Sequence, residues 1–118
     1  MNNIVKSIWV KQFETEYPTL AEELKRIQNE QYELFAKKNI SYGLGNIALG
    51  SQLDTEEEKQ ASTTGIFIRC WDKMNRLKNL VLLKQANPIN DESVEDTWKD
   101  LSVYGIIAQI VKNDKWKK

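Results

Sequence analysis

The sequence predicts an all-α protein, a bundle of about four helices. In four stretches, apolar residues recur every three or four positions, which is the period of an amphipathic helix. No stretch shows the strict alternation of a half-buried strand, and the two prolines, Pro18 and Pro88, lie where a helical stretch begins or ends. A chain of 118 residues is long enough for one core that buries roughly two-thirds of the unfolded surface. We therefore expect a single helical domain over residues 1–118.

Two helices are expected in the first 40 residues. Val5, Trp9 and Phe13 recur every four residues, which predicts a helix over residues 4–16. Thr19 followed by Glu22 matches a capping box, so a second helix is expected to begin there and to end near residue 38. Its predicted apolar face consists of Leu20, Leu24, Ile27, Leu34 and Phe35.

Residues 41–63 are expected to form a long loop. They contain three of the five glycines and the acidic run at 56–58, and at most one short helix beginning at Asp54. A loop of this length in a small domain is typical of a functional or mobile segment.

Two further helices are expected after this loop. Thr63 or Thr64 can cap a third helix that runs to about residue 84, and a fourth helix is expected from near Asp91 to about residue 112. The predicted core stripe of the third helix is Phe67, Cys70, Trp71, Met74, Leu77 and Val81. That of the fourth is Val94, Trp98, Leu101, Gly105 and Ala108, where glycine or alanine permits close helix approach.

Composition excludes several classes of function. Lys plus Arg and Asp plus Glu are both 17, so overall charge does not favour a protein that coats nucleic acid. With no histidine and only Cys70, the chain cannot form a Ser-His-Asp or Cys-His centre, a His- or Cys-ligated zinc site or an internal disulfide. The longest apolar stretch, 103–108, is too short to span a membrane, and a cytoplasmic protein is expected, in the host cytoplasm if a phage encodes it.

Three acids form one line on the expected fourth helix. Glu92, Asp96 and Asp100 are spaced i, i+4 and i+8. The same line continues to Val103, Ile107 and Ile110. The acids are therefore expected to face the interior or a subunit interface. Like charges at this spacing disfavour a helix by about 0.2–0.5 kcal/mol per pair, so positive charge is expected opposite them.

Two sources of that positive charge are possible. The expected third helix carries Arg69, Lys73 and Arg76 around the single acid Asp72, and a salt-bridge lattice between the helices could neutralise the acids. The other source is Mg2+ or Mn2+, which takes oxygen ligands and prefers one or two carboxylates with water and substrate phosphates. Spacing alone leaves both alternatives open.

Three blocks of the sequence form a recognisable series. They are Lys-Lys-Asn-Ile-Ser-Tyr-Gly at 37–43, Gly-Ile-Phe-Ile-Arg-Cys-Trp-Asp-Lys-Met-Asn-Arg-Leu at 65–77, and Asp-Glu-Ser-Val-Glu-Asp-Thr-Trp-Lys-Asp-Leu-Ser-Val-Tyr at 91–104. In this order they resemble the nucleotide modification associated domain of phage and bacterial proteins, a helical group similar to the MazG-like all-α nucleoside triphosphate pyrophosphatases. The resemblance covers roughly residues 20–112.

The resemblance implies a helical, commonly dimeric nucleotide-binding protein in which helix-borne acids hold Mg2+ or Mn2+ against phosphates. The metal ligands that it implies are Glu92, Asp96, Asp100 and Asp72. The nucleotide-binding residues that it implies are Lys38, Asn39, Tyr42, Arg69, Lys73 and Arg76. Other roles stay open for two of them, since Tyr42 could pack on the bundle and Lys38 could favour the negative end of its helix.

The chain departs from the MazG-like pattern at its acidic motifs. Glu-x-x-Asp is interrupted because Thr97 stands three residues before Asp100, and the helix expected to carry Glu-Glu-x-x-Glu has Asp72 as its only acid. Phosphate binding tolerates these departures better than hydrolysis does, because cleavage between phosphates usually needs three or four carboxylates around a metal-activated water.

Three functions are compatible with these observations. The first is a Mg2+-dependent pyrophosphohydrolase of a nucleoside triphosphate or modified nucleotide. The second is a phage protein that binds and sequesters a nucleotide or cyclic-nucleotide immune signal without cleaving it. The third is a helical homo-oligomeric assembly protein, because residues 91–100 hold five acids and one lysine whereas residues 69–84 hold five cations and one aspartate.

Overall fold

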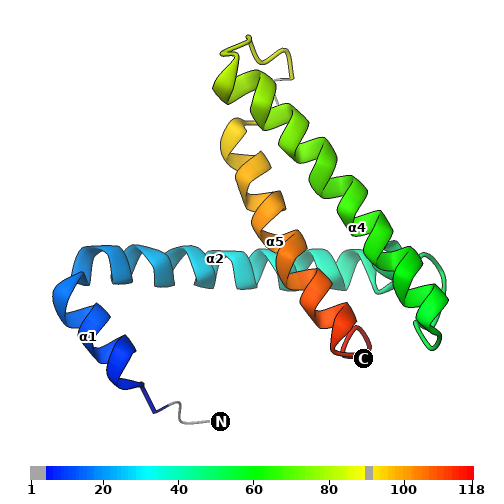
Figure 1. The fold of residues 1–118 in the computed structure, drawn as a ribbon, viewed down its shortest axis with the longest axis horizontal. Coiled ribbons are helices and arrows are strands. Elements are labelled where there is room, and N and C mark those ends of the chain that lie inside the picture. The colour runs from blue at the N-terminus through cyan, green and yellow to red at the C-terminus, as the bar shows by residue number, and fades with distance from the viewer. Residues whose placement is uncertain (1–4, 90–91) are drawn as a thin grey trace. The chain divides into compact units, whose positions relative to one another are not determined.

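The structure is a computed structural model that describes residues 5–89 and 92–118 (Figure 1). The elements follow in the order α1 (Ile8–Glu16), α2 (Pro18–Tyr42), α3 (Gly45–Ala48), α4 (Glu56–Leu77), the π-helical turn η1 (Lys78–Leu82) and α5 (Val94–Lys112). These ranges contain no strand, which confirms the predicted all-α class. The chain divides into two compact units, residues 1–36 and 37–118, and α2 belongs to both. None of the helices in the described ranges is long and apolar enough to cross a membrane.

The first unit consists of α1 and most of α2. The side chain of Ser7 caps α1 by accepting a hydrogen bond from the amide of Val10 at 3.1 Å. Pro18 opens α2, where its missing N–H costs no hydrogen bond. Thr19 therefore lies inside α2, and the prediction that it caps this helix is wrong. The expected start of the first helix at residue 4 lies outside the described residues.

Within this unit, an ion pair joins α1 to α2. Lys6 and Lys25 both bind the Glu14 carboxylate, at 2.9 and 3.3 Å, and the rings of Phe13 and Tyr17 lie 6.0 Å apart. Ala21 is the single buried side chain among residues 5–36. The apolar faces expected for these two helices exist, but most of their large side chains remain exposed.

The long loop predicted over residues 41–63 is mostly helical. α2 continues to Tyr42 and ends at Gly43, whose φ of +69° suits glycine and whose N–H donates to the carbonyl of Asn39 at 2.8 Å. The one-turn helix α3 follows, and α4 begins at Glu56. Only residues 43–55 join α2 to α4, and α3 occupies four of them.

A capping box opens α4 at Thr55, eight residues before Thr63, the first of the two predicted caps. Thr55 accepts from the amide of Glu58, and the Glu58 carboxylate accepts from the Thr55 amide. Thr63 and Thr64, the predicted caps, lie inside the helix, where their hydroxyls donate to carbonyls four residues earlier. The acidic run 56–58 occupies the first turn, where negative charge is favourable.

In the second unit, α4 and α5 pack side by side and run in opposite directions (Figure 1). The buried side chains that they share are Ser62, Ile66 and Leu77 from α4 and Thr97, Ile107 and Val111 from α5. Lys59 and Asp114 form an ion pair at 2.6 Å where α4 starts and α5 ends. α3 packs against α4, and the hydroxyl of Ser62, 1% exposed, donates to the carbonyl of Ile47 at 2.8 Å.

The predicted core stripes are partly wrong. Phe67, Trp71, Met74 and Trp98 are between 52 and 62% exposed, because α4 and α5 meet on neighbouring faces instead. Gly105 is exposed and a Cβ there would meet nothing within 4 Å, so it does not provide close helix approach. The face that continues the acidic line is buried at Ile107, as predicted.

The π-helical turn η1 explains where the third helix departs from prediction. The amide of Leu83 donates to the carbonyl of Lys78, a span of five residues that admits one extra residue to the turn. Residues beyond this point are rotated relative to an uninterrupted helix, and Val81 is 42% exposed. The regular helix ends at Leu77 and η1 at Leu82, and the expected start of the fourth helix at Asp91 lies outside the described residues.

Candidate functional site

Two cations of α4 face Asp100 of α5 and Glu92, which lies just before that helix. The ammonium group of Lys73 lies 2.9 Å from Oε1 of Glu92 and 3.2 Å from Oδ2 of Asp100. All three side chains are half-buried, at 21, 31 and 29% exposure. One ammonium group thus bridges Asp100 of α5 and Glu92, which precedes the helix. Because α5 begins at Val94 after its N-cap Ser93, the prediction that Glu92 lies on the same helical line as Asp96 and Asp100 is wrong.

Arg76 fixes the start of α5 to the end of α4. Its Nε donates to the hydroxyl of Thr97 at 3.0 Å and lies 3.7 Å from the Glu92 carboxylate. Its Nη2 donates to the backbone carbonyl of Glu92 and to Oδ1 of Asn87, the latter at 3.2 Å. Thr97 is fully buried, and the Arg76 side chain is 17% exposed. The Nε and Nη2 donors of this guanidinium are therefore occupied by groups of its own chain.

The C-terminal end of α2 reaches the same ions. The ammonium group of Lys38 lies 3.7 Å from Oδ1 of Asp100. Asn39 is half-buried and contributes its backbone carbonyl to the end of the helix, whereas Tyr42 is 64% exposed. We call the connected ions the charged seam, and it consists of Lys38, Lys73, Arg76, Glu92 and Asp100.

The remaining predicted site residues lie outside the charged seam. Asp96 forms a capping box with Ser93, and the hydrogen bond from the Ser93 amide holds the pKa of Asp96 below its usual value. Arg69 donates to the carbonyl of Asn46 at 3.0 Å and thus binds the α3 segment. Asp72 is exposed on α4.

Two of the four residues expected to bind a metal therefore converge, and they converge on Lys73. Within residues 5–89 and 92–118, no group of three or more His, Cys, Asp or Glu side chains is arranged to hold a metal ion. Glu92 and Asp100 could bind a cation between them only where the Lys73 ammonium group now lies.

The electrostatics of the charged seam favour charged side chains. A hydrogen bond from Lys73 lowers the pKa of Glu92. Burial opposes the charge on Lys73, but its hydrogen bonds to Glu92 and Asp100 outweigh burial and raise its pKa. Tyr104, one turn after Asp100, has a raised pKa because it is partly buried and close to that carboxylate.

Sequence reasoning missed Thr97, Asn87 and Tyr104 as neighbours of these ions. Tyr104 follows Asp100 at i+4, a spacing that places the two on one helix face. Asn87 precedes Pro88 in an irregular segment, where no periodic signal exists.

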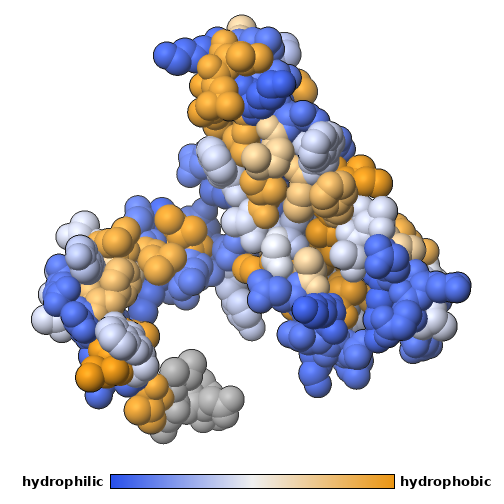
Figure 2. Space-filling view, in the orientation of Figure 1, coloured by the Kyte–Doolittle hydropathy of each residue, from blue (hydrophilic) through white to orange (hydrophobic). Residues whose placement is uncertain are grey.

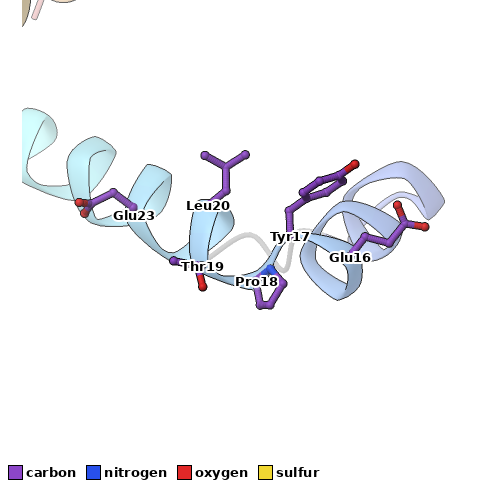
Figure 3. A pocket seen from close by; sticks show the side chains of 6 residues that line it. All are labelled: Glu16, Tyr17, Pro18, Thr19, Leu20 and Glu23. Atoms are coloured by element: carbon purple, nitrogen blue, oxygen red, sulfur yellow. The ribbon is translucent and has the colours of Figure 1, made fainter.

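The first unit contains an open hollow at the junction of α1 and α2 (Figure 3). It is lined by Glu16, Tyr17, Pro18, Thr19, Leu20 and Glu23. Its walls are mostly apolar, and none of the residues singled out for chemistry lines it. Figure 3 shows the side chains of Tyr17 and Leu20 on the same side of the chain.

Comparison with family models, with curated proteins and with solved structures finds no match to this chain.

Proposed function

We propose that this chain is a nucleotide-binding protein that holds phosphate groups, together with Mg2+, at the charged seam. One observation carries the proposal. Lys38, Lys73 and Asp100 come from the three sequence blocks that resemble a nucleotide-binding family, and they form one chain of ion pairs at 3.2 and 3.7 Å. The end of α2 and the middle of α5, more than 60 residues apart in sequence, thus supply a cation and a carboxylate to the charged seam.

This combination of charges suits a magnesium–phosphate ligand. Mg2+ commonly binds one or two carboxylates, with phosphates and water completing its shell, and Glu92 and Asp100 are such a pair. On binding, Mg2+ would take the place of the Lys73 ammonium group, which would then pair with a phosphate oxygen. Lys38, whose side chain is 52% exposed, supplies a second positive charge, while Arg76 continues to hold α5 in place.

The geometry supports binding more directly than hydrolysis. Cleavage of a pyrophosphate bond needs an activated water and neutralisation of developing charge, which Mg2+ on only two carboxylates supplies less fully. Pyrophosphohydrolase activity is the stronger form of the proposal, and sequestration of an intact nucleotide or cyclic nucleotide is the weaker form.

The test is thermal unfolding of the protein with nucleoside mono-, di- and triphosphates and cyclic nucleotides, each with and without Mg2+. A ligand at 100 times its Kd stabilises the folded state by about 2.7 kcal/mol, which is a readily measured rise in Tm. We expect Asp100→Asn to abolish the Mg2+-dependent part of this rise. Glu95→Gln is the matched control, because Glu95 lies on the same helix, is 79% exposed and forms a long ion pair with Lys99, at 3.9 Å.

Chromatography of the nucleotide after incubation separates the two forms of the proposal. Released pyrophosphate or phosphate indicates hydrolysis, and recovery of the intact nucleotide indicates sequestration. If no nucleotide raises the Tm of the folded protein, with or without Mg2+, the proposal is wrong.

A second candidate function, a helical assembly protein without a small ligand, is favoured by a separate observation. The seam carboxylates already pair with cations of their own chain, while α4 exposes a row of large apolar side chains, Phe67, Trp71 and Met74. Such a row is typical of an interface between subunits. In this case Trp71→Ser would change the sedimentation coefficient, and no nucleotide would change the Tm.

A further inference from the structure

The residues that follow α5 turn back toward the start of α4. The helix α5 ends at Lys112, and Asp114 has a φ of +57°, a left-handed conformation that reverses the chain after a helix. The amide of Lys115 donates to the carbonyl of Ile110 at 3.1 Å, which is the hydrogen bond of a Schellman motif. We call residues 113–118, which this motif redirects, the strap.

Two side chains attach the strap to segments that lie much earlier in the chain. The Asp114 carboxylate pairs with the ammonium group of Lys59, near the start of α4, at 2.6 Å. The indole N–H of Trp116 donates to the backbone carbonyl of Leu44, the residue before α3, at 3.1 Å. Figure 2 shows hydrophilic surface where α4 begins and α5 ends. Trp116 is half-buried, whereas the other five strap residues are exposed, so Trp116 is the member of the strap that packs against the rest of its unit.

The one-turn helix α3 depends on donors from other segments. A helix of four residues is too short to be stable on its own. Two side chains of α4, those of Ser62 and Arg69, donate to carbonyls of α3 at 2.8 and 3.0 Å. The strap supplies a third donor, Trp116, from the far end of α5. Ile47 and Ala48 of α3 are buried in this arrangement, so α3 stays in place only while these segments hold it.

We propose that the strap controls a local opening of the protein: it closes α3 onto α4, and its release frees residues 43–51 while α4 and α5 stay paired. Release exchanges a neutral hydrogen bond and a partly exposed ion pair for contacts with water, and each of these interactions is weak. The buried side chains shared by α4 and α5 are not disturbed, so this opening requires less free energy than global unfolding. Because residues 43–55 join α2 to α4, the strap also determines how firmly the end of α2, which carries Lys38, is held.

Amide hydrogen exchange of the free protein, followed by mass spectrometry, tests this role of the strap. The amides that report on α3 are those of residues 47, 48, 50 and 51, which all donate to carbonyls within residues 44–48. Trp116→Phe keeps an aromatic ring and removes the N–H donor. It should speed exchange of these amides about fivefold, because exchange follows the opening equilibrium. Trp116→Ala removes the ring as well and should speed their exchange at least about tenfold, while amides in the middle of α5 exchange as before.

Two further variants complete the experiment. Trp98→Phe is the matched control, because it makes the same chemical change on α5 at a tryptophan that is 52% exposed, and it should leave exchange of residues 47–51 unchanged. Asp114→Asn removes the charge that pairs with Lys59, and asparagine tolerates the left-handed conformation found there. It should speed exchange of the same amides about twofold at low salt, because a partly exposed ion pair contributes little.

Two results would overturn the proposal. The first is equal exchange of residues 47–51 in Trp116→Ala and Trp98→Phe, which would mean that the strap does not hold α3. The second is faster exchange to the same extent throughout α4 and α5 in both Trp116 variants, which would mean that Trp116 stabilises the whole unit and not a local closure. The inference is independent of nucleotide binding, because every measurement is made without a ligand and none of the variants alters the charged seam.

Discussion

Replacing Lys73 by methionine tests whether the charged seam stabilises the protein in solution. The variant keeps most of the side-chain stem and removes the ammonium group that lies 2.9 Å from Glu92 and 3.2 Å from Asp100. Glu92 keeps only the more distant Arg76 Nε at 3.7 Å, and Asp100 keeps only Lys38 at the same distance. Two carboxylates thus lose their closest cation.

The expected loss follows from the burial of these groups. A hydrogen bond to a charged group contributes about 1.5–3 kcal/mol when it is well buried, whereas an exposed ion pair contributes about 0.2–1 kcal/mol. Both carboxylates are close to 30% exposed. We therefore expect Lys73→Met to lower the free energy of unfolding by about 1–2 kcal/mol.

Urea unfolding followed by circular dichroism measures this change, at one fixed protein concentration for all variants. Lys99→Met is the control, because Lys99 is 43% exposed and lies 3.9 Å from its partner Glu95; its expected cost is below about 0.5 kcal/mol. The double variant Lys73→Met/Asp100→Asn should lose less free energy of unfolding than the two single variants lose together, because the two side chains interact. If Lys73→Met and Lys99→Met unfold at the same urea concentration, the charged seam does not stabilise the protein as we expect.

The other predictions concern pH, helix ends and glycines. The pKa of Glu92 is held below 4.5 and that of Lys73 above 10.5, so their contribution should disappear as pH falls below about 4.5 or rises above about 10.5, and Lys73→Met should flatten both limbs of a stability–pH curve. Ser93→Ala removes the cap of α5 and should cost about 1 kcal/mol in urea unfolding; no change would mean that this helix end is frayed. Gly105→Ala should raise the free energy of unfolding by about 0.5–1 kcal/mol, and with it Tm, because Gly105 lies inside a helix and the added methyl group meets no other atom. Gly43→Ala should lower the free energy of unfolding by about 1 kcal/mol, and with it Tm, because φ is +69° at Gly43 although the space around it is equally open. Equal shifts in Tm for the two glycine variants would contradict the role given to φ at Gly43.

Helical periodicity predicted the class of the fold and three of the four long helices to within a few residues at most ends. It failed between residues 41 and 63, where glycines and acids were taken as signs of a loop. The acids at 56–58 instead belong to the first turn of α4, because the capping box formed by Thr55 and Glu58 permits a helix to begin directly before them. Thr55 and Glu58 have the same spacing as the pair Thr19 and Glu22, which forms no cap, because Pro18 already opens α2.

The face of each helix was harder to predict than its position. Ile66 and Phe67 are neighbours in sequence and lie on different faces of α4. Only the packing of α5 decides that Ile66 is 4% and Phe67 62% exposed. Charge was more informative than hydrophobicity. The line of acids predicted from the sequence called for positive charge opposite it, and Lys73 lies 2.9 Å from Glu92 and 3.2 Å from Asp100. Whether Mg2+ also binds there remains a prediction.

The small number of buried side chains in one copy has a consequence for how this protein is made and handled. Seven apolar side chains are buried among the described residues, so we expect one copy on its own to be only marginally stable. If copies of this chain associate, folding and association become a single equilibrium, in which every tenfold dilution lowers stability by about 1.4 kcal/mol. Freshly synthesised chains should remain open to proteolysis until enough of them have accumulated to meet.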